Sequence, residues 1–434
     1  MTAWRVGIAI KPEDPENFGV EDTNEQWHYV GVGMDFNFTL NNNWRFQNGM
    51  GSKIPELEFE GRLSGTWGAN LYLDYNNFYW LRFGLEGYAF TTDQITVDSA
   101  TVNRGIHIFT TSNSKSIKSF SLMIKKLDRE VGGTSDETIL LLGCTMNKVT
   151  SNYESTTSAV KCSIGGSFVD TKLTYNNLDD TLGYVESTKN AITPINWGCL
   201  QVMNVDDTAW EKIANNEKTS FSFNRSVQTI PECGERIDTA YQESGIQPIG
   251  ITSTVYSRNP NQWQTRAHSG GIRDDVAVGS TSQPRNKGLQ PMPNIRIASQ
   301  SADTQYDCYA EFEDVVVDSW GNSYNSGTEI TESPTLKARK GRIIFKTPDV
   351  ATQLISPTLN SVKVVYNFQD SDISNFITYT TVGDTITLLD PKKDGSVFSK
   401  WTSGGTDYKG GQKVTIQQSM VSDGVLTFTA TWTS

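Results

Sequence analysis

The chain has 434 residues, of which 36% are hydrophobic and 20% are charged, so it is long enough for two to four domains with hydrophobic cores and is not intrinsically disordered. Its formal net charge of -12 argues against a protein that grips nucleic acid through clustered Lys and Arg. Such a charge suits a protein that lets DNA pass without adhering to it. With 11% aromatic residues and 36 glycines, the composition predicts a mainly β fold with few helices.

Targeting signals are not evident in the chain. The first ten residues hold one Arg followed by a short apolar run, and the longest apolar run elsewhere is residues 139–142. Both are too short for a signal peptide or a membrane span. We therefore expect synthesis in a cytoplasm without export by the usual secretory route.

Alternating apolar and polar residues predict several strands in the body of the chain. From Leu57 to Trp67 the alternation indicates one long half-buried strand with a charged outer face, and residues 120–124 alternate similarly. Residues 159–170 predict a strand interrupted at Gly165–Gly166, where we expect a bulge or a close backbone approach. The best helix candidate is residues 206–215, because an Asp at its start would cap a turn or two.

A faint internal repeat links two parts of the body. Phe36 and Phe38 are echoed by Phe221 and Phe223, and a glycine followed by a basic residue and Ile comes after each pair, with offsets of 183 to 185 residues. Such spacing predicts two similar β units in tandem. Chance is the alternative, because F-x-F patterns are common.

No enzymatic motif is present. The sequence has no G-x-S-x-G, no Walker loop, no H-E-x-x-H and no G-x-G-x-x-G after a strand, and the histidines share no ligand spacing: His28, His107 and His268. Adjacent acids point to opposite sides of an extended strand, so the doublets are expected to be turn or cap residues: Asp179–Asp180, Asp206–Asp207 and Asp274–Asp275. We therefore expect no catalytic residues, no metal site and no cofactor.

Two further groups of residues have simple structural interpretations. The five cysteines are far apart and never in C-x-x-C, which predicts reduced thiols packed as small hydrophobic groups: Cys144, Cys162, Cys199, Cys233 and Cys308. Asp370, Asp372 and Asn375 resemble part of a calcium loop but lack the required glycine. They are interpreted as an acidic turn.

The last seventy or so residues predict a small β module, in which short strands alternate with glycine turns. Pro391, Gly395, Phe398 and Trp401 give the pattern P-x-x-x-G-x-x-F-x-x-W, which is followed by G-G, Y-x-x-G and a closing T-A-x-W. This order resembles the B-repeat domain of bacterial and phage surface proteins, first described in the internalin adhesins. The resemblance implies a surface-exposed appendage, in which residues such as Tyr408 and Lys409 would make contacts.

The body resembles the tail tube proteins of long-tailed phages and archaeal viruses of the same lineage. The resemblance rests on the order of four stretches and fades between about residues 267 and 294. The four stretches are residues 35–55, 58–67, 78–84 and 143–168. In that family a β-sandwich or half-barrel unit contributes strands to a ring around a DNA channel, and stacked rings make the tube. Appended surface domains are common there, so the two resemblances support each other.

These resemblances imply the domain organisation. One tube unit is expected at residues 1–165 and a second at residues 166–355, the latter with a flexible loop at residues 266–293. A hinge at residues 357–360 would lead to the B-repeat-like domain, residues 361–434. The fold expected is therefore mainly β, a tail-tube β-sandwich or half-barrel that is duplicated if the repeat is real, plus a small β module.

The family also implies partners and surfaces. The chain would assemble with itself, as a trimer if duplicated and otherwise as a hexamer, and would contact tape-measure and terminator proteins in the virion tail after assembly in the host cytoplasm. Genomic DNA would pass through without specific binding. Glu56, Glu58 and Glu60 would line the lumen and repel phosphates, although a solvated outer face is the alternative. Residues 49–55 and 266–293 would make contacts between rings.

Two other classes of function remain open. A carbohydrate-binding or adhesin-like protein would use exposed aromatics such as Trp401, Tyr408 and Trp432, but the B-repeat pattern uses the two tryptophans in its own core. A wall-degrading enzyme would need two carboxylates brought together in a cleft. A tail terminator or another protein with the tube fold is also compatible with the sequence.

Overall fold

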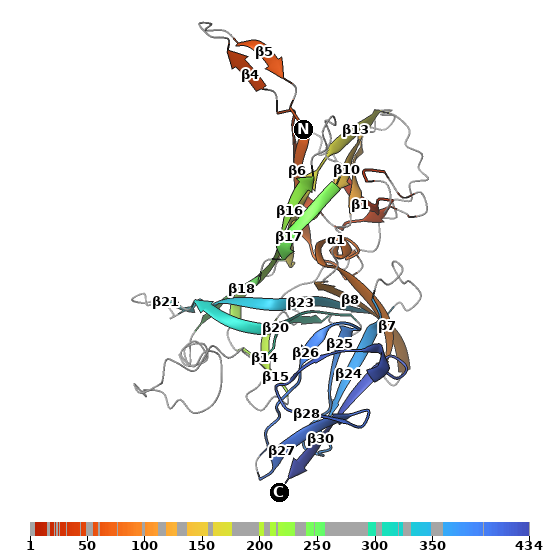
Figure 1. Cartoon of the computed structure of the whole chain (residues 1–434), viewed down its shortest axis with the longest axis vertical. Coiled ribbons are helices and arrows are strands. Elements are labelled where there is room, and N and C mark those ends of the chain that lie inside the picture. The colour runs from red at the N-terminus through yellow and green to blue at the C-terminus, as the bar shows by residue number, and fades with distance from the viewer. Residues whose placement is uncertain are drawn as a thin grey trace.

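In the computed structural model the chain is almost entirely β structure (Figure 1). The residues described are 5–14, 18–20, 22, 25, 27–31, 33–43, 45–48, 55–59, 61–75, 77–97, 100–111, 119–127, 137–154, 159–175, 199–203, 209–213, 216–230, 240–246, 248–256, 294–300, 306–319, 321–323, 331–348, 359–393 and 395–433. Among them, the only helical elements are α1 (Leu81–Leu85) and the 3-10 turn η1 (Gln418–Met420). The prediction of a mainly β fold is confirmed.

The strands of the body fall into two sets with the same pairing pattern. The first set is β1 (Arg5–Pro12), β2 (His28–Tyr29), β3 (Gly33–Asn41), β4 (Arg45–Asn48), β5 (Pro55–Phe59), β6 (Ser64–Tyr72), β9 (Phe120–Leu127), β10 (Glu137–Cys144), β11 (Lys148–Glu154), β12 (Lys161–Phe168) and β13 (Asp170–Tyr175). The second set is β14 (Cys199–Met203), β15 (Trp210–Lys212), β16 (Asn216–Ile230), β17 (Ala240–Ile246), β18 (Ile249–Tyr256), β19 (Ile295–Gln300), β20 (Asp307–Ser319) and β23 (Thr335–Thr347). We call them the first unit and the second unit.

The correspondence follows the hydrogen-bonded neighbours. In the first unit β2 pairs with β1, β1 with β9, β9 with β10 and β10 with β13. In the second unit β15 pairs with β14, β14 with β19, β19 with β20 and β20 with β23. The strands β3, β6, β12 and β11 pair in that order, as do β16, β18, β23 and the end of β20. The body therefore contains the same arrangement twice.

In the second unit, two long strands each replace two strands of the first. The first half of β20 corresponds to β10 and its second half to β11, and β23 corresponds to β12 and β13 in the same way. The chain turns through the left-handed region at Gly143, near the end of β10, and at Asp314, within β20. Each unit also has a hairpin, β4–β5 and β16–β17. Phe36 and Phe38 lie on β3 and Phe221 and Phe223 on β16, so the residues of the sequence repeat occupy equivalent strands.

One extended sheet runs through both units, because β11 of the first pairs with β16 of the second, while β1, β2, β9, β10 and β13 form a separate five-stranded sheet. A second connection runs through β7 (Glu86–Val97) and β8 (Ala100–Thr111), since β8 pairs with β23. Two short strands, β21 (Asn322–Ser323) and β22 (Thr331–Glu332), extend the sheet beside β18. One hydrophobic core spans both units, with aromatic side chains such as Trp80, Phe83 and Phe312 fully buried.

The hairpin β4–β5 projects from the body as an arm (Figure 1). The chain bends at Asn43, whose backbone lies in the left-handed region with φ 51°. Its side-chain amide donates to the Arg62 carbonyl at 2.7 Å and to Ser64 Oγ at 3.0 Å, which fixes the base of the arm. The prediction of one strand from Leu57 to Trp67 is therefore wrong: β5 belongs to the arm, β6 belongs to the main sheet, and residues 61–63 between them are not strand.

Other predictions have clear outcomes. Residues 120–124 lie in β9, as expected. The predicted helix at 206–215 is wrong in its described part, because Trp210–Lys212 form β15. The predicted boundary at residue 165 falls inside β12. The whole loop at 266–293 and residues 357 and 358 of the hinge lie outside the described residues. In the rest of the hinge, Leu359 donates its N–H to the Tyr88 carbonyl at 3.1 Å and so ties the chain to β7.

Residues 361–433 form a module with its own core around Trp401, Phe428 and Tyr366. Its strands are β24 (Ser361–Asn367), β25 (Phe376–Thr381), β26 (Thr385–Thr387), β27 (Val397–Ser403), β28 (Thr406–Tyr408), β29 (Lys413–Thr415) and β30 (Val425–Thr433). β24 pairs with β30 in parallel, and the other pairs are antiparallel. The predicted glycine turns occur: Gly404 and Gly405 have positive φ between β27 and β28. The acidic turn is also present, since Asp370 accepts from the Asp372 N–H at 2.8 Å.

Gly166 marks a close backbone approach, as the sequence indicated. The chain leaving β10 runs against β12, with the Thr145 N–H bonded to the Ser167 carbonyl at 2.8 Å. A Cβ on Gly166 would lie 1.7 Å from the Thr145 carbonyl oxygen, which is backbone and has no room to move.

We therefore predict that Gly166→Ala lowers the free energy of unfolding by at least about 1–3 kcal/mol. The added methyl group would force two packed backbone segments apart. Urea unfolding measures the change. Gly321→Ala is the matched control, since a Cβ there meets nothing within 4 Å. Equal stability of the two variants would contradict the close approach.

Candidate functional site: the open edges of the sheet and the module interface

The junction between the two units is a fully formed strand pair. Along it, Val149 lies opposite Phe223 and Ser151 lies opposite Phe221. All four side chains are buried. Beyond the strand pair the Arg225 N–H donates to the Asn147 carbonyl at 2.8 Å, and the Arg225 guanidinium donates to the Phe83 carbonyl at 3.2 Å. The junction thus satisfies the backbone of two strand edges and covers their aromatic side chains.

The strand of the first unit that corresponds to β16 lacks such a neighbour. β3 ends the path of the extended sheet and pairs only with β6 among the described strands. Phe38 is 37% exposed and Leu40 36% exposed, whereas the equivalent Phe223 is 4% exposed. Phe38 contacts Phe168 edge-on, with ring centroids 6.2 Å apart. The outer edge of β3 therefore presents backbone groups beside apolar side chains.

Among the described strands, the one in the second unit that corresponds to β11 also has no neighbour on one side. Residues 315–319 of β20 pair with β23, while β19 pairs with β20 only as far as Phe312. Val316 and Val317 are half-buried, and Asp318 and Ser319 are exposed. The two open edges lie at opposite ends of the run of strands β20, β23, β18, β16, β11, β12, β6 and β3. Natural proteins rarely leave such edges uncovered, because they template further pairing.

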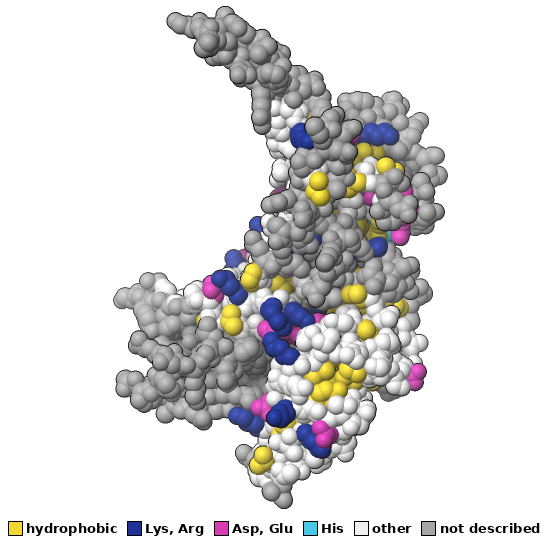
Figure 2. All heavy atoms as spheres, in the orientation of Figure 1, with side chains coloured by type: hydrophobic (Ala, Val, Ile, Leu, Met, Phe, Trp, Pro, Cys, Tyr) yellow, Lys and Arg dark blue, Asp and Glu magenta, His cyan; other side chains and the backbone are white. Residues whose placement is uncertain are grey.

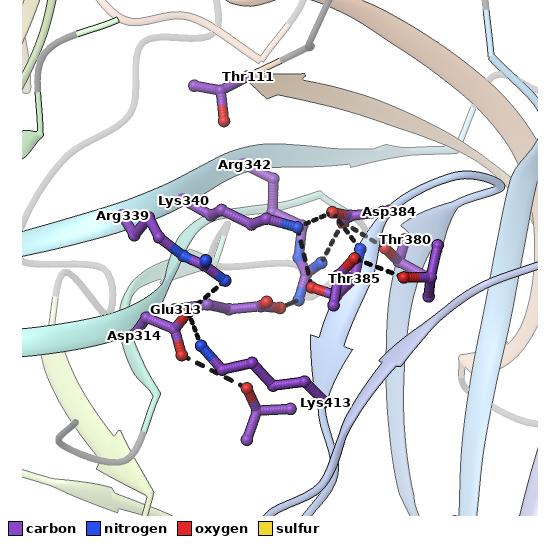
Figure 3. A network of polar contacts seen from close by, with 12 residues as sticks. Thr111, Glu313, Asp314, Arg339, Lys340, Arg342, Thr380, Asp384, Thr385 and Lys413 are labelled. Carbon is purple, nitrogen blue, oxygen red and sulfur yellow. Dashed lines mark hydrogen bonds and ion pairs between the residues drawn. The ribbon is translucent and has the colours of Figure 1, made fainter. Parts of the chain in front are cut away.

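Charged side chains join the module to the body at a buried interface (Figure 3). Arg342 on β23 donates from Nε to Glu311 at 2.9 Å and from a terminal nitrogen to Glu313, and its other terminal nitrogen lies 3.8 Å from Asp384 of the module. Lys340 also bonds Asp384 and donates to the Thr385 carbonyl at 2.9 Å. One guanidinium therefore serves two carboxylates of the body and one of the module.

A second part of this interface surrounds the kink of β20. Asp314 accepts from Lys413 of the module at 2.9 Å and pairs with Arg339 of β23 at 2.6 Å. Beside these residues lies a hollow of about 790 Å³, lined by both body and module. In Figure 2 dark-blue Lys and Arg side chains gather with acidic ones at this place. The opposed charges position the module on the body.

Aromatic packing completes the interface. Tyr379 of β25 is buried among aliphatic residues of β7, β8 and β23, and its hydroxyl donates to Asp93 at 3.0 Å. The ammonium of Lys346 lies 5.3 Å from the Tyr309 ring centroid and 5.4 Å from that of Tyr379. The module is thus held by apolar burial as well as by ion pairs, and it is not a freely tethered appendage.

The pKa values of the interface carboxyls move in opposite directions. Burial raises the pKa of Glu313, and the neighbouring Arg342 only partly offsets that effect. Burial also raises the pKa of Asp384, but the charges of Arg342 and Lys340 outweigh it, so this pKa is lowered overall. The carboxylates around Arg342 hold it in the charged form by raising its pKa despite burial.

The residues that the sequence placed in functional surfaces, in the arm and in the module, do not form one site in the described structure. Glu56 and Glu58 lie on β5 of the arm, and Glu60 is outside the described residues, so their lumen position stays a prediction. Tyr408 lies half-buried at the end of β28, with its ring 5.6 Å from that of Phe428, and the exposed Lys409 follows it. Their contact role also stays a prediction. The sequence pattern did not reveal the interface around Arg342, because its members are spread over more than 70 residues.

The other residues considered from sequence have structural surroundings. Trp401 is fully buried and its indole N–H donates to the Leu389 carbonyl at 2.6 Å, so it belongs to the module core as the pattern predicted. Burial lowers the pKa of His107 to about 4, and its Nδ1 lies 2.9 Å from the Tyr88 hydroxyl. His28 stacks on Tyr79, and burial followed by the Arg82 charge lowers its pKa to about 4. His268 and the three acid doublets are outside the described residues.

Cys144, Cys162 and Cys308 are free and buried, as expected. Among the described residues no group of three or more His, Cys, Asp or Glu side chains is placed to hold a metal ion. Within the same part of the chain, no helix has the length and hydropathy needed to cross a bilayer.

No protein-family model and no curated protein matches the chain. The function proposed below therefore depends on the sequence patterns and on the geometry just described.

We predict that Asp384→Asn lowers the free energy of unfolding by about 2 kcal/mol at neutral pH, because Lys340 and Arg342 each lose a charged partner in a largely buried place. Because the pKa of Asp384 is lowered in the folded protein, this stabilisation is present above the ordinary value of 3.8 and is lost as the pH falls through the folded pKa. Thermal unfolding at pH 7 and pH 3 measures both effects. Asp407→Asn is the control, since that ion pair with Lys400 is exposed, and it should leave stability unchanged.

Glu313→Gln tests a pH dependence of stability that is opposite in sign to that of Asp384. With a pKa raised above the ordinary 4.5, Glu313 favours the folded state at acidic pH, and that advantage is lost as the pH rises through the folded pKa. The stability of the natural chain relative to Glu313→Gln should therefore fall as the pH rises above 4.5. Urea unfolding across that range measures it. Glu154→Gln should show the reverse trend, because Lys218 lowers the pKa of Glu154; the same trend in both variants would contradict the assignment.

Proposed function

We propose that the chain is a structural protein of a viral tail, which assembles with itself into stacked rings that form the tail tube and conduct DNA into the host. The observation that carries this proposal is the pair of open edges, β3 and residues 315–319, at opposite ends of a sheet whose two units already join through equivalent strands. A protein with that arrangement extends by adding copies of itself.

Several further features agree with this function. The stretches in β3, β6 and β12 that resemble tail tube proteins lie side by side in the sheet. The net charge of -12 suits a channel that must not retain DNA phosphates. The arm β4–β5 projects from the body, where a neighbouring ring would be reached (Figure 1). The module lies at the opposite end of the molecule from the arm, consistent with a decorating surface domain.

The two other classes of function have weaker support. An adhesin would need its tryptophans at the surface, but Trp401 is fully buried and the Trp432 indole donates to the Phe368 carbonyl at 2.7 Å. A wall-degrading enzyme would need a carboxyl pair facing its substrate. In the described part of the chain, Glu311, Glu313 and Asp384 do meet, but they surround Arg342 and are used to hold the module.

The test is electron microscopy of the purified full chain at high concentration. We expect rings or stacked tubes with a central hole. Rings that never stack would indicate a tail terminator, because a terminator caps a tube and does not extend it. Monomers at every concentration, also in the presence of a preformed tail scaffold, would contradict the proposal.

A further inference from the structure

We infer that two copies of this chain join by antiparallel pairing of β3 from one copy with residues 315–319 of β20 from the next, with Phe38 opposite Val317. The inference deepens the proposed function and rests on it for the identity of the partner, a second copy of the chain. It adds the two strands, their direction and their register.

The register follows from three strand pairs that occur in both units and from the junction between β11 and β16. In the first unit, Phe36 pairs with Ala69 and Ala69 with Ile164. In the second unit, Phe221 pairs with Ile251 and Ile251 with Leu336. Ile164 is therefore equivalent to Leu336.

The next pair reaches the open edge. Ile164 pairs with Val149, and Leu336 pairs with Val317, so Val149 and Val317 are equivalent. Within the chain Val149 lies opposite Phe223, the residue equivalent to Phe38. Repeating this junction between copies places Val317 opposite Phe38 and Val316 opposite Thr39. Asp318 comes next along β20, at a bulge in its pairing with β23, and so faces Asn37.

Burial supports the same equivalence. At the internal junction Val149 is 1% exposed and Phe223 is 4% exposed, whereas Val317 is only half-buried and Phe38 is 37% exposed. Residues that are covered by the junction inside the chain are uncovered at the two open edges. Pairing of the edges would bury Phe38 against Val317, which adds apolar contact to the backbone hydrogen bonds.

The pairing is head-to-tail. Each copy has one β3 edge and one β20 edge, and the two differ, so the contact uses a different surface on each partner and repeats around a ring or along a filament. Because the internal junction already joins two equivalent units, every junction around such a ring would have the same strand order. The Leu40 N–H would then donate to the Val315 carbonyl of the next copy, as Arg225 does to Asn147 inside the chain.

Disulfide trapping tests the register. Asn37 and Asp318 are exposed, so Asn37→Cys and Asp318→Cys should fold normally, which thermal unfolding of each variant checks. Directly opposite residues of an antiparallel pair have Cβ atoms about 4.5–5.5 Å apart, close to the span of a disulfide. Mixing the two variants under a mild oxidant should give a covalent dimer that neither variant gives alone and that the natural chain, with its own five cysteines, does not give.

The matched control shifts the register by two residues. Thr39→Cys mixed with Asp318→Cys should give several-fold less dimer than Asn37→Cys mixed with Asp318→Cys. A chain carrying both Asn37→Cys and Asp318→Cys should give a ladder of covalent oligomers that ends at the number of copies in the ring, three if two units per chain close a six-unit ring.

Three results would overturn the inference. Dimers from Asn37→Cys alone would show that two β3 edges meet around a two-fold axis. Equal or greater trapping of the shifted pair would show that the register is wrong. Rings seen by electron microscopy without disulfide trapping of the double variant would overturn this interface and leave the proposed function intact. Disulfide trapping without rings or tubes would support the interface and contradict the proposed tail-tube function.

Discussion

Backbone hydrogen bonding at strand edges is the constraint on which this structure depends. A buried or apolar strand edge must find a partner for its N–H and C=O groups, and the chain meets that need at the centre of the body by pairing β11 with β16. The pair joins two units that share one hydrophobic core. Among the described strands the same constraint is unmet at β3 and at the end of β20.

Ion pairs between charged side chains position the module on the body. Arg342 is buried among Glu311, Glu313 and Asp384, and such a group tolerates burial only because each charge has a partner with good geometry. Tyr379 and the aliphatic residues around it supply the apolar part of the contact. The module therefore has a fixed direction relative to the sheet edges. In an assembly it would stand in the same place on every copy.

The sequence predicted some local features correctly and others incorrectly. The strand at residues 120–124, the close approach at Gly166 and the buried Trp401 follow from periodicity, glycine chemistry and a compact motif. The alternation from Leu57 to Trp67 was regular enough to suggest one strand. Asn43 bends the opposing chain and bonds the Arg62 carbonyl, and at this point the predicted strand is divided into β5 and β6. The helix at residues 206–215 was wrong because Trp210–Lys212 pair with β14, a contact that local propensity does not contain.

By itself the sequence determined that the protein is mainly β, that it ends in a small module with an aromatic core, and that two parts of the body repeat a pair of phenylalanines. These features are local, because they depend on residue alternation, turn glycines and spacing. Only the tertiary structure decided that the repeat extends to the order of strand pairing and that Arg342 links the module to the body. It also decided that β3 and residues 315–319 have no further partner among the described strands. Those features arise from residues far apart in the chain, whose meeting depends on packing and strand pairing across the whole fold.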